Sequence, residues 1–142
     1  NVYGIEKDME KAHVITDFIR KGFETGVIDM MTDGTEAREF LYAEDCCEAL
    51  ESIMENYDQL TSDDELHITT GSHTTILEVA RIIQRLFSNI EKDVVIQPAE
   101  SKDEVQKDAR NIPDPYIKKF WRSKTSLKKG ITKVFEEMKK DY

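Results

Sequence analysis

The sequence has few cysteines, a deficit of positive charge and no long apolar run, and each shortage excludes a class of protein. Its two cysteines, Cys46 and Cys47, are adjacent, which argues against a disulfide framework or a zinc site. The 20 Lys and Arg are outnumbered by 29 Asp and Glu, and a net charge of -9 argues against nucleic acid or an anionic membrane as partner. No apolar run approaches the ~20 residues that cross a bilayer, and no secretory signal is recognisable. We therefore expect a cytoplasmic protein.

The length of 142 residues and the composition predict one globular domain over residues 1 to 142. Its charge is uneven: residues 1 to 101 contain 8 Lys and Arg against 22 Asp and Glu, whereas residues 102 to 142 contain 12 against 7. In one interpretation the basic tail packs on the acidic body. In the other, some of its cations surround an anionic ligand.

The apolar periodicity of the first third predicts a helix followed by a hairpin. Residues 9 to 24 have the spacing of an amphipathic helix. Residues 27 to 31 and 37 to 42 have the composition of strands, and the pair Asp33 and Gly34 between them is a turn signal.

The rest of the sequence alternates helices and strands, which predicts an α/β fold. Thr75 and Glu78 form a capping box, and Asp114 before Pro115 is typical of a helix start. Ser126 is expected to cap the last helix. The expected elements are helices over residues 45 to 57, 76 to 87, 115 to 121 and 127 to 138, strands over 66 to 70 and 93 to 98, and a loop over 99 to 112.

Tyr3 and Lys7 have the Tyr-x-x-x-Lys spacing by which many nicotinamide-dependent oxidoreductases place a catalytic tyrosine and lysine. Such a pair must share one face of a helix beside a dinucleotide, because the lysine stabilises the phenolate. Here Asn1, Gly4 and Asp8 are poor helix formers, and no glycine-rich phosphate turn precedes the pair. We expect a loop after a strand and assign no catalytic residue to the chain.

Five stretches carry more specific information: NVYG at residues 1 to 4, HVITDFI at 13 to 19, DGTEAREFLYAEDCCEAL at 33 to 50, HITTGSHTTILEVARII at 67 to 83 and SLKKGI at 126 to 131. Taken in order, they resemble the carboxy-terminal half of the extended short-chain dehydrogenase/reductases that act on nucleotide sugars, the NAD-dependent epimerase/dehydratase family. The most specific block is D-G-T-x-x-R-x-F-x-Y-x-x-D. In that family NVYG follows the true Tyr-x-x-x-Lys helix, so Tyr3 and Lys7 only imitate the spacing.

The resemblance implies a division of labour within a larger enzyme. An amino-terminal Rossmann half, absent from this chain, would bind NAD or NADP and carry the catalytic residues. This chain would be a small α/β substrate-binding domain for a nucleoside diphosphate sugar. Alone, it is expected to bind no dinucleotide and to lack turnover, because hydride transfer needs a cofactor within reach of the sugar. The resemblance is also compatible with assembly of the chain into an oligomer.

Arg38 is the leading candidate for the substrate site. Its planar guanidinium can bind two diphosphate oxygens at once, which is the role that the resemblance implies. The alternative is a surface pair with Glu36 or Glu39, which would contribute ~1 kcal/mol or less. Asn1 matches a family asparagine whose amide points into the substrate site, and its alternative is a polar residue that satisfies local backbone groups.

The other candidates come from three segments. His13 and Val14 begin the first helix, where unpaired N–H groups favour an anion; the alternative for His13 is a solvated cap. Ile28 and Met30 match the family segment that lies against the nucleobase, and their alternative is core packing. His13 shows no metal-ligand spacing with the other two histidines, so no metal site is expected.

The family run arginine-proline-glycine-aspartate appears here as Glu100 to Asp103. Lys102 is therefore a candidate for the phosphate role, as a point charge instead of a fork. Arg110 falls where the family has an arginine that reaches the diphosphate. Asp114 falls near the position of a ribose ligand, but its sequence context favours a helix cap.

Two functions remain open at this point. The first is the substrate-binding part of an NAD(P)-dependent nucleotide-sugar epimerase or dehydratase. The second is a stand-alone binding or interaction module that is derived from the same fold and does not catalyse a reaction. The sequence identifies neither the base nor the sugar of the substrate.

Overall fold

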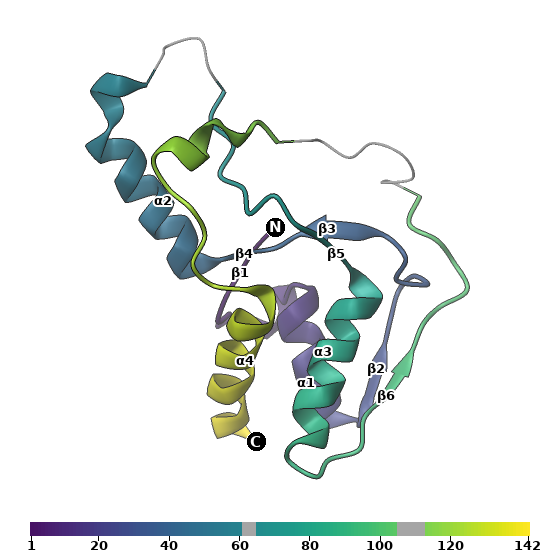
Figure 1. The fold of residues 1–142 in the computed structure, drawn as a ribbon. Helices are drawn as coiled ribbons and strands as arrows, with labels where there is room; N and C mark the ends of the chain where they lie inside the picture. Colours follow the sequence, from purple (N-terminus) through teal and green to yellow (C-terminus); the bar gives the residue numbers. More distant parts are fainter. Residues whose placement is uncertain (61–64, 105–112) are drawn as a thin grey trace.

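A computed structural model describes residues 1 to 60, 65 to 104 and 113 to 142. Helices α1 (Val14–Glu24), α3 (Ile76–Ser88) and α4 (Leu127–Met138) pack on one another and form the main layer (Figure 1). Helix α2 (Ala43–Glu55) extends away from this layer (Figure 1). No helix in the described ranges has the length and hydropathy to cross a membrane. The α/β class predicted from the sequence is confirmed.

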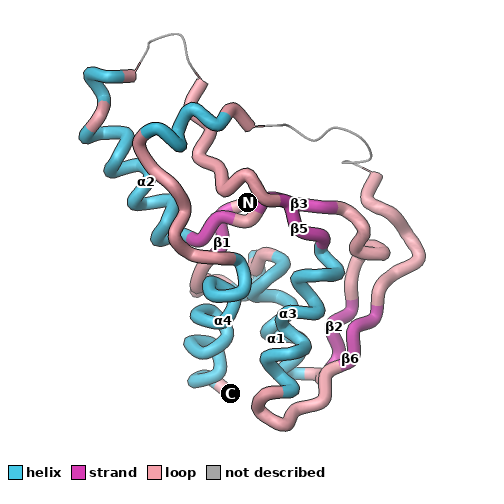
Figure 2. Tube along the Cα trace, in the orientation of Figure 1, coloured by secondary structure: helices cyan, strands magenta, loops and turns pink. Residues whose placement is uncertain are grey.

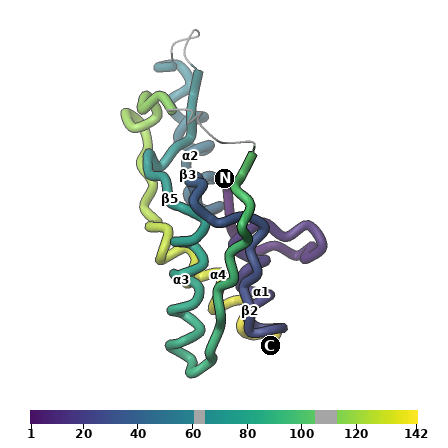
Figure 3. Tube along the Cα trace, turned by 90° about the vertical axis from the view of Figure 1, so that its right-hand side faces the viewer, coloured from purple at the N-terminus to yellow at the C-terminus, as the bar shows by residue number. Residues whose placement is uncertain are grey.

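Short strands form three separate ladders (Figure 2). Strands β1 (Val2–Tyr3) and β4 (Leu41–Tyr42) pair in parallel, β2 (Val27–Asp29) and β6 (Val95–Gln97) pair in parallel, and β3 (Ala37–Glu39) and β5 (His73–Thr75) pair antiparallel. Figure 3 shows β2 and β6 side by side. Each ladder joins segments that are far apart in the sequence.

The predicted hairpin between residues 27 to 31 and 37 to 42 is wrong. The main-chain N–H of Met30 donates to the carbonyl oxygen of Gln97 at 2.9 Å, which continues the ladder with β6. Leu77 donates its N–H to the carbonyl oxygen of Gly34 at 3.0 Å. The turn at Gly34, whose φ is 76°, therefore leads the chain to the start of α3 instead of back along β2.

Two other elements differ from their predicted bounds. Residues 9 to 24 do not form one helix, because Ala12 and His13 are extended and separate the short 3₁₀ helix η1 (Met9–Lys11) from α1. The predicted strand over residues 66 to 70 is absent, and β5 begins only at His73. At the end of this segment, the carboxylate of Glu39 accepts the N–H groups of Thr70 and Gly71, so these donors are not available to a neighbouring strand.

The predicted helix caps are confirmed. The hydroxyl oxygen of Thr75 accepts the N–H of Glu78 at 3.1 Å before α3, and that of Ser126 accepts the N–H of Lys129 at 3.4 Å before α4. The carboxylate of Asp114 accepts the N–H of Tyr116 at 2.7 Å and starts the 3₁₀ helix η3 (Pro115–Lys119). Local hydrogen bonds of this kind depend on residues two or three apart, which a sequence displays directly.

The main hydrophobic core lies where α1, α3 and α4 meet. Phe87 and Phe135 are fully buried there, with ring centroids 4.9 Å apart in an edge-to-face arrangement. A second cluster lies under α2 and consists of Leu41, Ala49, Ile117 and Trp121. Asp45, in the first turn of α2, accepts the N–H groups of Lys124 at 3.0 Å and Thr125 at 2.9 Å. This carboxylate therefore ties α2 to the segment that leads into α4.

Tyr3 belongs to the main core and forms no pair with Lys7. Its ring packs against Phe40 and Tyr42, and its hydroxyl donates to the carbonyl oxygen of Leu127 at 3.4 Å. Burial raises the pKa of its phenol well above the usual range, and the charges of Tyr42 and Asp45 act in the same direction. A catalytic tyrosine needs a lowered pKa, so this geometry is that of a packing residue.

Candidate functional site

A cavity of about 690 Å³ opens between β1, the start of α1, the end of β2 and β3. Five of the residues that the sequence singled out line it: Asn1, His13, Val14, Met30 and Arg38. These residues lie in or directly beside β1, α1, β2 and β3, and the fold brings them to one concave surface. The volume lies within the range of small-molecule sites, which is roughly 300 to 1,000 Å³.

Arg38 reaches the cavity from the middle of β3, opposite Thr74 of β5. Its guanidinium forms an ion pair with the carboxylate of Asp103, which also lines the cavity. Only 20% of the Arg38 side chain and 15% of the Asp103 side chain are exposed. A mostly buried guanidinium requires a counter-charge, and Asp103 supplies one. The predicted alternative, a surface pair with Glu36 or Glu39, is not what the structure shows.

Glu6 occupies the start of α1, where the sequence predicted room for an anion. Its carboxylate accepts the main-chain N–H of His13 at 2.9 Å and also bonds to the His13 ring and the Thr16 hydroxyl. Burial raises the pKa of Glu6, but these hydrogen bonds outweigh burial and hold it below its usual value. The anion at this helix end is therefore part of the chain itself. Sequence reasoning missed Glu6, because no local spacing connects it to residue 13.

The amide of Asn1 is bound to the protein. Its Nδ2 donates to the main-chain carbonyl oxygen of Glu39 at 3.2 Å, and the main-chain carbonyl oxygen of Asn1 accepts the N–H of Leu41 at 2.8 Å. These bonds place Asn1 along the cavity wall. Its side chain satisfies a backbone group, as in the alternative that the sequence left open.

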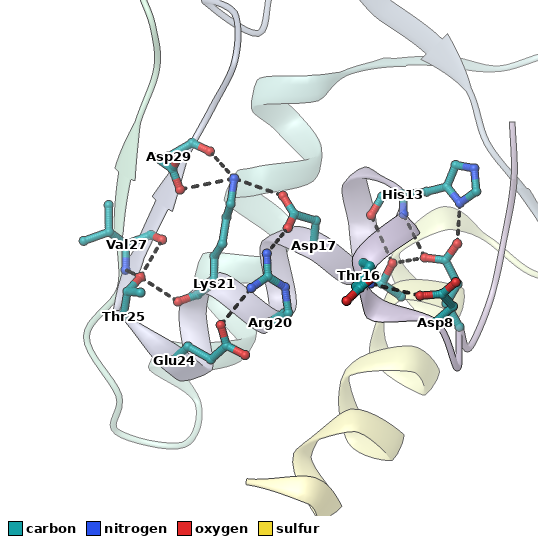
Figure 4. A network of polar contacts seen from close by, with 12 residues as sticks. Asp8, His13, Thr16, Asp17, Arg20, Lys21, Glu24, Thr25, Val27 and Asp29 are labelled. Atoms are coloured by element: carbon teal, nitrogen blue, oxygen red, sulfur yellow. Dashed lines mark hydrogen bonds and ion pairs between the residues drawn. The ribbon is translucent and has the colours of Figure 1, made fainter.

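A charge network on α1 forms another part of the wall (Figure 4). The ammonium of Lys21 lies 3.0 Å from Asp17 and 3.2 Å from Asp29, and it donates to the carbonyl oxygen of Asp29 at 2.9 Å. Burial lowers the pKa of Lys21, but the bonds to both carboxylates outweigh it and raise the pKa. The i, i+4 spacing of Asp17 and Lys21 could have indicated half of this network. The contact with Asp29 is long-range and gives no local signal.

Among the described residues, the ionisable side chains that line the cavity are more acidic than basic. Asp17, Asp29, Glu36 and Asp103 face two cations, Lys21 and Arg38, which gives a formal charge of -2 with neutral histidine. Both cations are already paired with carboxylates. An anionic ligand would therefore have to compete with Asp103 for the guanidinium of Arg38.

The remaining candidates lie away from the cavity wall or outside the described residues. Ile28 is fully buried in the main core, so its side chain has the packing role that the sequence left as an alternative. Lys102 is exposed and does not line the cavity. Asp114 caps η3, and its N–H donates to the ring of His67 at 2.9 Å. Arg110 lies outside the described residues, and no group of three metal-binding side chains occurs among those described.

The sequence of this chain is similar to a known family model and to known enzymes. The model of a family described as "NAD dependent epimerase/dehydratase family" matches residues 1 to 69. A GDP-L-fucose synthase of Sinorhizobium fredii is 29% identical over 143 residues, which cover 96% of this chain and 44% of that protein. A trifunctional UDP-glucose 4,6-dehydratase, epimerase and reductase of Arabidopsis thaliana is 30% identical over 96% of this chain and 20% of its own length.

Solved structures show the same similarity in three dimensions. A UDP-glucose 4-epimerase of Thermotoga maritima superposes on 99% of this chain and 44% of its own, with a TM-score of 0.73 and 24% identity. An epimerase of Methanothermobacter thermautotrophicus gives a TM-score of 0.78 at 18% identity, over 99% of this chain and 41% of its own. The chain thus spans less than half the length of each of these four relatives.

Proposed function

We propose that the chain is a member of the NAD-dependent epimerase/dehydratase family, whose model matches residues 1 to 69, and that it is the substrate-binding half of a nucleotide-sugar enzyme and holds the nucleoside diphosphate. The observation that carries this proposal is the shared cavity of Arg38, Asn1, the start of α1 and Met30. Catalysis is assigned to a different part of the parent enzyme. The relatives named above support a nucleotide sugar as the substrate class. No particular reaction is assigned to this chain.

Arg38 is proposed to bind the diphosphate. A guanidinium offers two parallel N–H donors to phosphate oxygens, and Nη2 of Arg38 already donates to the carboxylate of Asp103. A diphosphate carries more negative charge than one carboxylate and replaces Asp103 on the guanidinium. Met30 and Met31 border the same cavity, and their flexible side chains provide an adaptable apolar surface for a base.

The described residues do not fit the dinucleotide that the family uses. A dinucleotide's pyrophosphate is held by a glycine-rich turn at the amino end of a helix. Here the helix that follows β1 has its start occupied by the carboxylate of Glu6, and the only glycine between them is Gly4. We therefore assign NAD or NADP to the rest of the parent enzyme and derive no hydride-transfer step for this chain.

Thermal unfolding in the presence of nucleoside diphosphates tests the proposal. A ligand that binds only the folded chain, at about 100 times its dissociation constant, adds about 2.7 kcal/mol to the free energy of unfolding. Replacing Arg38 with Ala should abolish most of this gain. Lys129→Ala is a matched control, because Lys129 is exposed on α4 and does not line the cavity. An equal gain in the Arg38 and Lys129 variants would disprove the assignment of Arg38.

A further inference from the structure

Glu36 borders the same cavity two residues before Arg38. Its main-chain carbonyl accepts the N–H of Ile76 at 3.1 Å, which extends the pairing of β3 and β5 by one residue. Side chains two apart on a strand point to the same face and are separated by roughly 7 Å. Glu36 and Arg38 are therefore neighbouring groups on one wall, with opposite charges.

The carboxylate of Glu36 is only half satisfied by the protein. One oxygen, Oε1, accepts the hydroxyl of Thr32 at 2.6 Å, and Thr32 also lines the cavity. The other oxygen, Oε2, is shielded from solvent and has no hydrogen-bond partner among the described residues. An unsatisfied buried acceptor costs about 1 to 3 kcal/mol, and more when it is charged. The nearby carboxylate of Glu39, by contrast, accepts donors from Thr69, Thr70 and Gly71.

The charges on this wall determine which part of a nucleotide can lie beside Glu36. A diphosphate is repelled by a carboxylate and binds at Arg38. In a nucleoside diphosphate bound at Arg38, the part that extends from the diphosphate toward Glu36 is the nucleoside. Met30, Met31 and Thr32 line the cavity near Glu36, since Thr32 bonds to it directly. Glu36 is thus placed to contact the base and needs a hydrogen-bond donor from it.

We infer that Glu36 makes the site select a guanine nucleoside diphosphate; this inference rests on the proposed function. The edge of guanine presents two adjacent donors, the ring N1–H and the exocyclic amino group, and a carboxylate accepts from both at once. Uracil and thymine present one N–H between two carbonyl oxygens, which a carboxylate repels. A bidentate contact with a base discriminates by about 1 to 3 kcal/mol, which corresponds to roughly 5-fold to 150-fold in affinity.

Calorimetric titration of GDP and UDP into the chain and its Glu36→Gln variant tests this inference. The chain should bind GDP roughly 5-fold to 150-fold more tightly than UDP. The variant has one donor and one acceptor in place of two acceptors, so it should lose GDP affinity by a similar factor while UDP affinity stays equal or rises. Glu136→Gln, an exposed change on α4, is the matched control.

The outcomes separate the inference from the proposal on which it rests. Tighter binding of UDP, or an equal loss of both nucleotides in the Glu36→Gln variant, overturns the guanine inference and leaves the proposed function intact. The equal loss would mean that Glu36 contacts the ribose, which both nucleotides share. If the chain binds neither nucleotide, the proposed function fails, and the inference fails with it. Without ligand, the Glu36→Gln variant should unfold at the same temperature as the unchanged chain, which shows that the variant is folded.

Discussion

The guanidinium of Arg38 is paired with the carboxylate of Asp103, 65 residues later in the sequence. The pair joins β3 to the segment that follows β6, and both side chains line the proposed substrate cavity. A structural ion pair and a ligand site therefore share the same cation. The strength of diphosphate binding should depend on how readily Asp103 yields its place.

Replacing Asp103 with Asn should tighten the binding of inorganic pyrophosphate. The change keeps the size of the side chain and removes the charge that competes for Arg38, so the anion no longer displaces a carboxylate. Inorganic pyrophosphate is the probe because it has no ribose or base. Calorimetric titration of the variant should give a several-fold lower dissociation constant. The control is Asp141→Asn, which lies in η4 (Lys139–Asp141) and does not line the cavity, and weaker binding by the Asp103 variant would contradict the prediction.

Replacing Gly130 with Ala should destabilise the protein, although the same change usually stabilises a helix by roughly 1 kcal/mol. A β-carbon at this position would lie 1.9 Å from the hydroxyl oxygen of Tyr3 and 2.8 Å from the ring carbon that bears it. Overfilling a packed core costs about 1 to 3 kcal/mol. Urea unfolding of Gly130→Ala should show this loss. Tyr3→Phe removes the nearest atom, so the double variant should recover part of it, whereas additive effects would exclude this contact as the cause.

Acid should weaken the fold in part through Asp45. Burial raises the pKa of this carboxyl, but hydrogen bonds from Ser123, Thr125 and the main chain of Lys124 outweigh burial and hold it below its ordinary value of 3.8. A lowered pKa means that the folded state binds the proton less well than the unfolded state. The stabilisation is therefore present at neutral pH and is lost as the pH falls below about 4.

The Asp45→Asn variant checks this assignment. At pH 7 it should be less stable by about 2 kcal/mol, because the neutral amide loses the charge-assisted hydrogen bonds. Between about pH 5 and pH 2 its unfolding temperature should fall less steeply than that of the parent chain. Some slope will remain, because the pKa values of Glu6 and Glu39 are also lowered. An unchanged slope would show that Asp45 does not contribute to acid unfolding.

The features that the sequence predicted well are local. Helices α3 and α4 follow from a cap at Thr75 or Ser126 and from apolar residues three and four apart, and the structure confirms both. The ladders could not be predicted in the same way. Each strand has only two or three residues, which is too short for a period of two to specify a partner.

In the candidate site, too, the sequence predicts local features better than long-range contacts. Arg38 and Met30 lie in segments where the family resemblance gave an expectation, and both line the cavity. Ile28 does not, because it is fully buried in the main core, whereas Met30, which also belongs to that core, lies past the end of β2 and borders the cavity. The pairings of Glu6 with His13 and of Arg38 with Asp103 depend on where the folded chain places distant residues. No spacing in the sequence contains that information.

The hydrophobic cluster under α2 is separate from the one that α1, α3 and α4 share, and it is much smaller. Segments with few buried apolar contacts open at a lower free energy than the rest of a protein. The backbone amides of α2 should therefore exchange with deuterated solvent sooner than those of α3. The two ends of this small molecule differ in their resistance to local opening, and the cavity lies in the more persistent one.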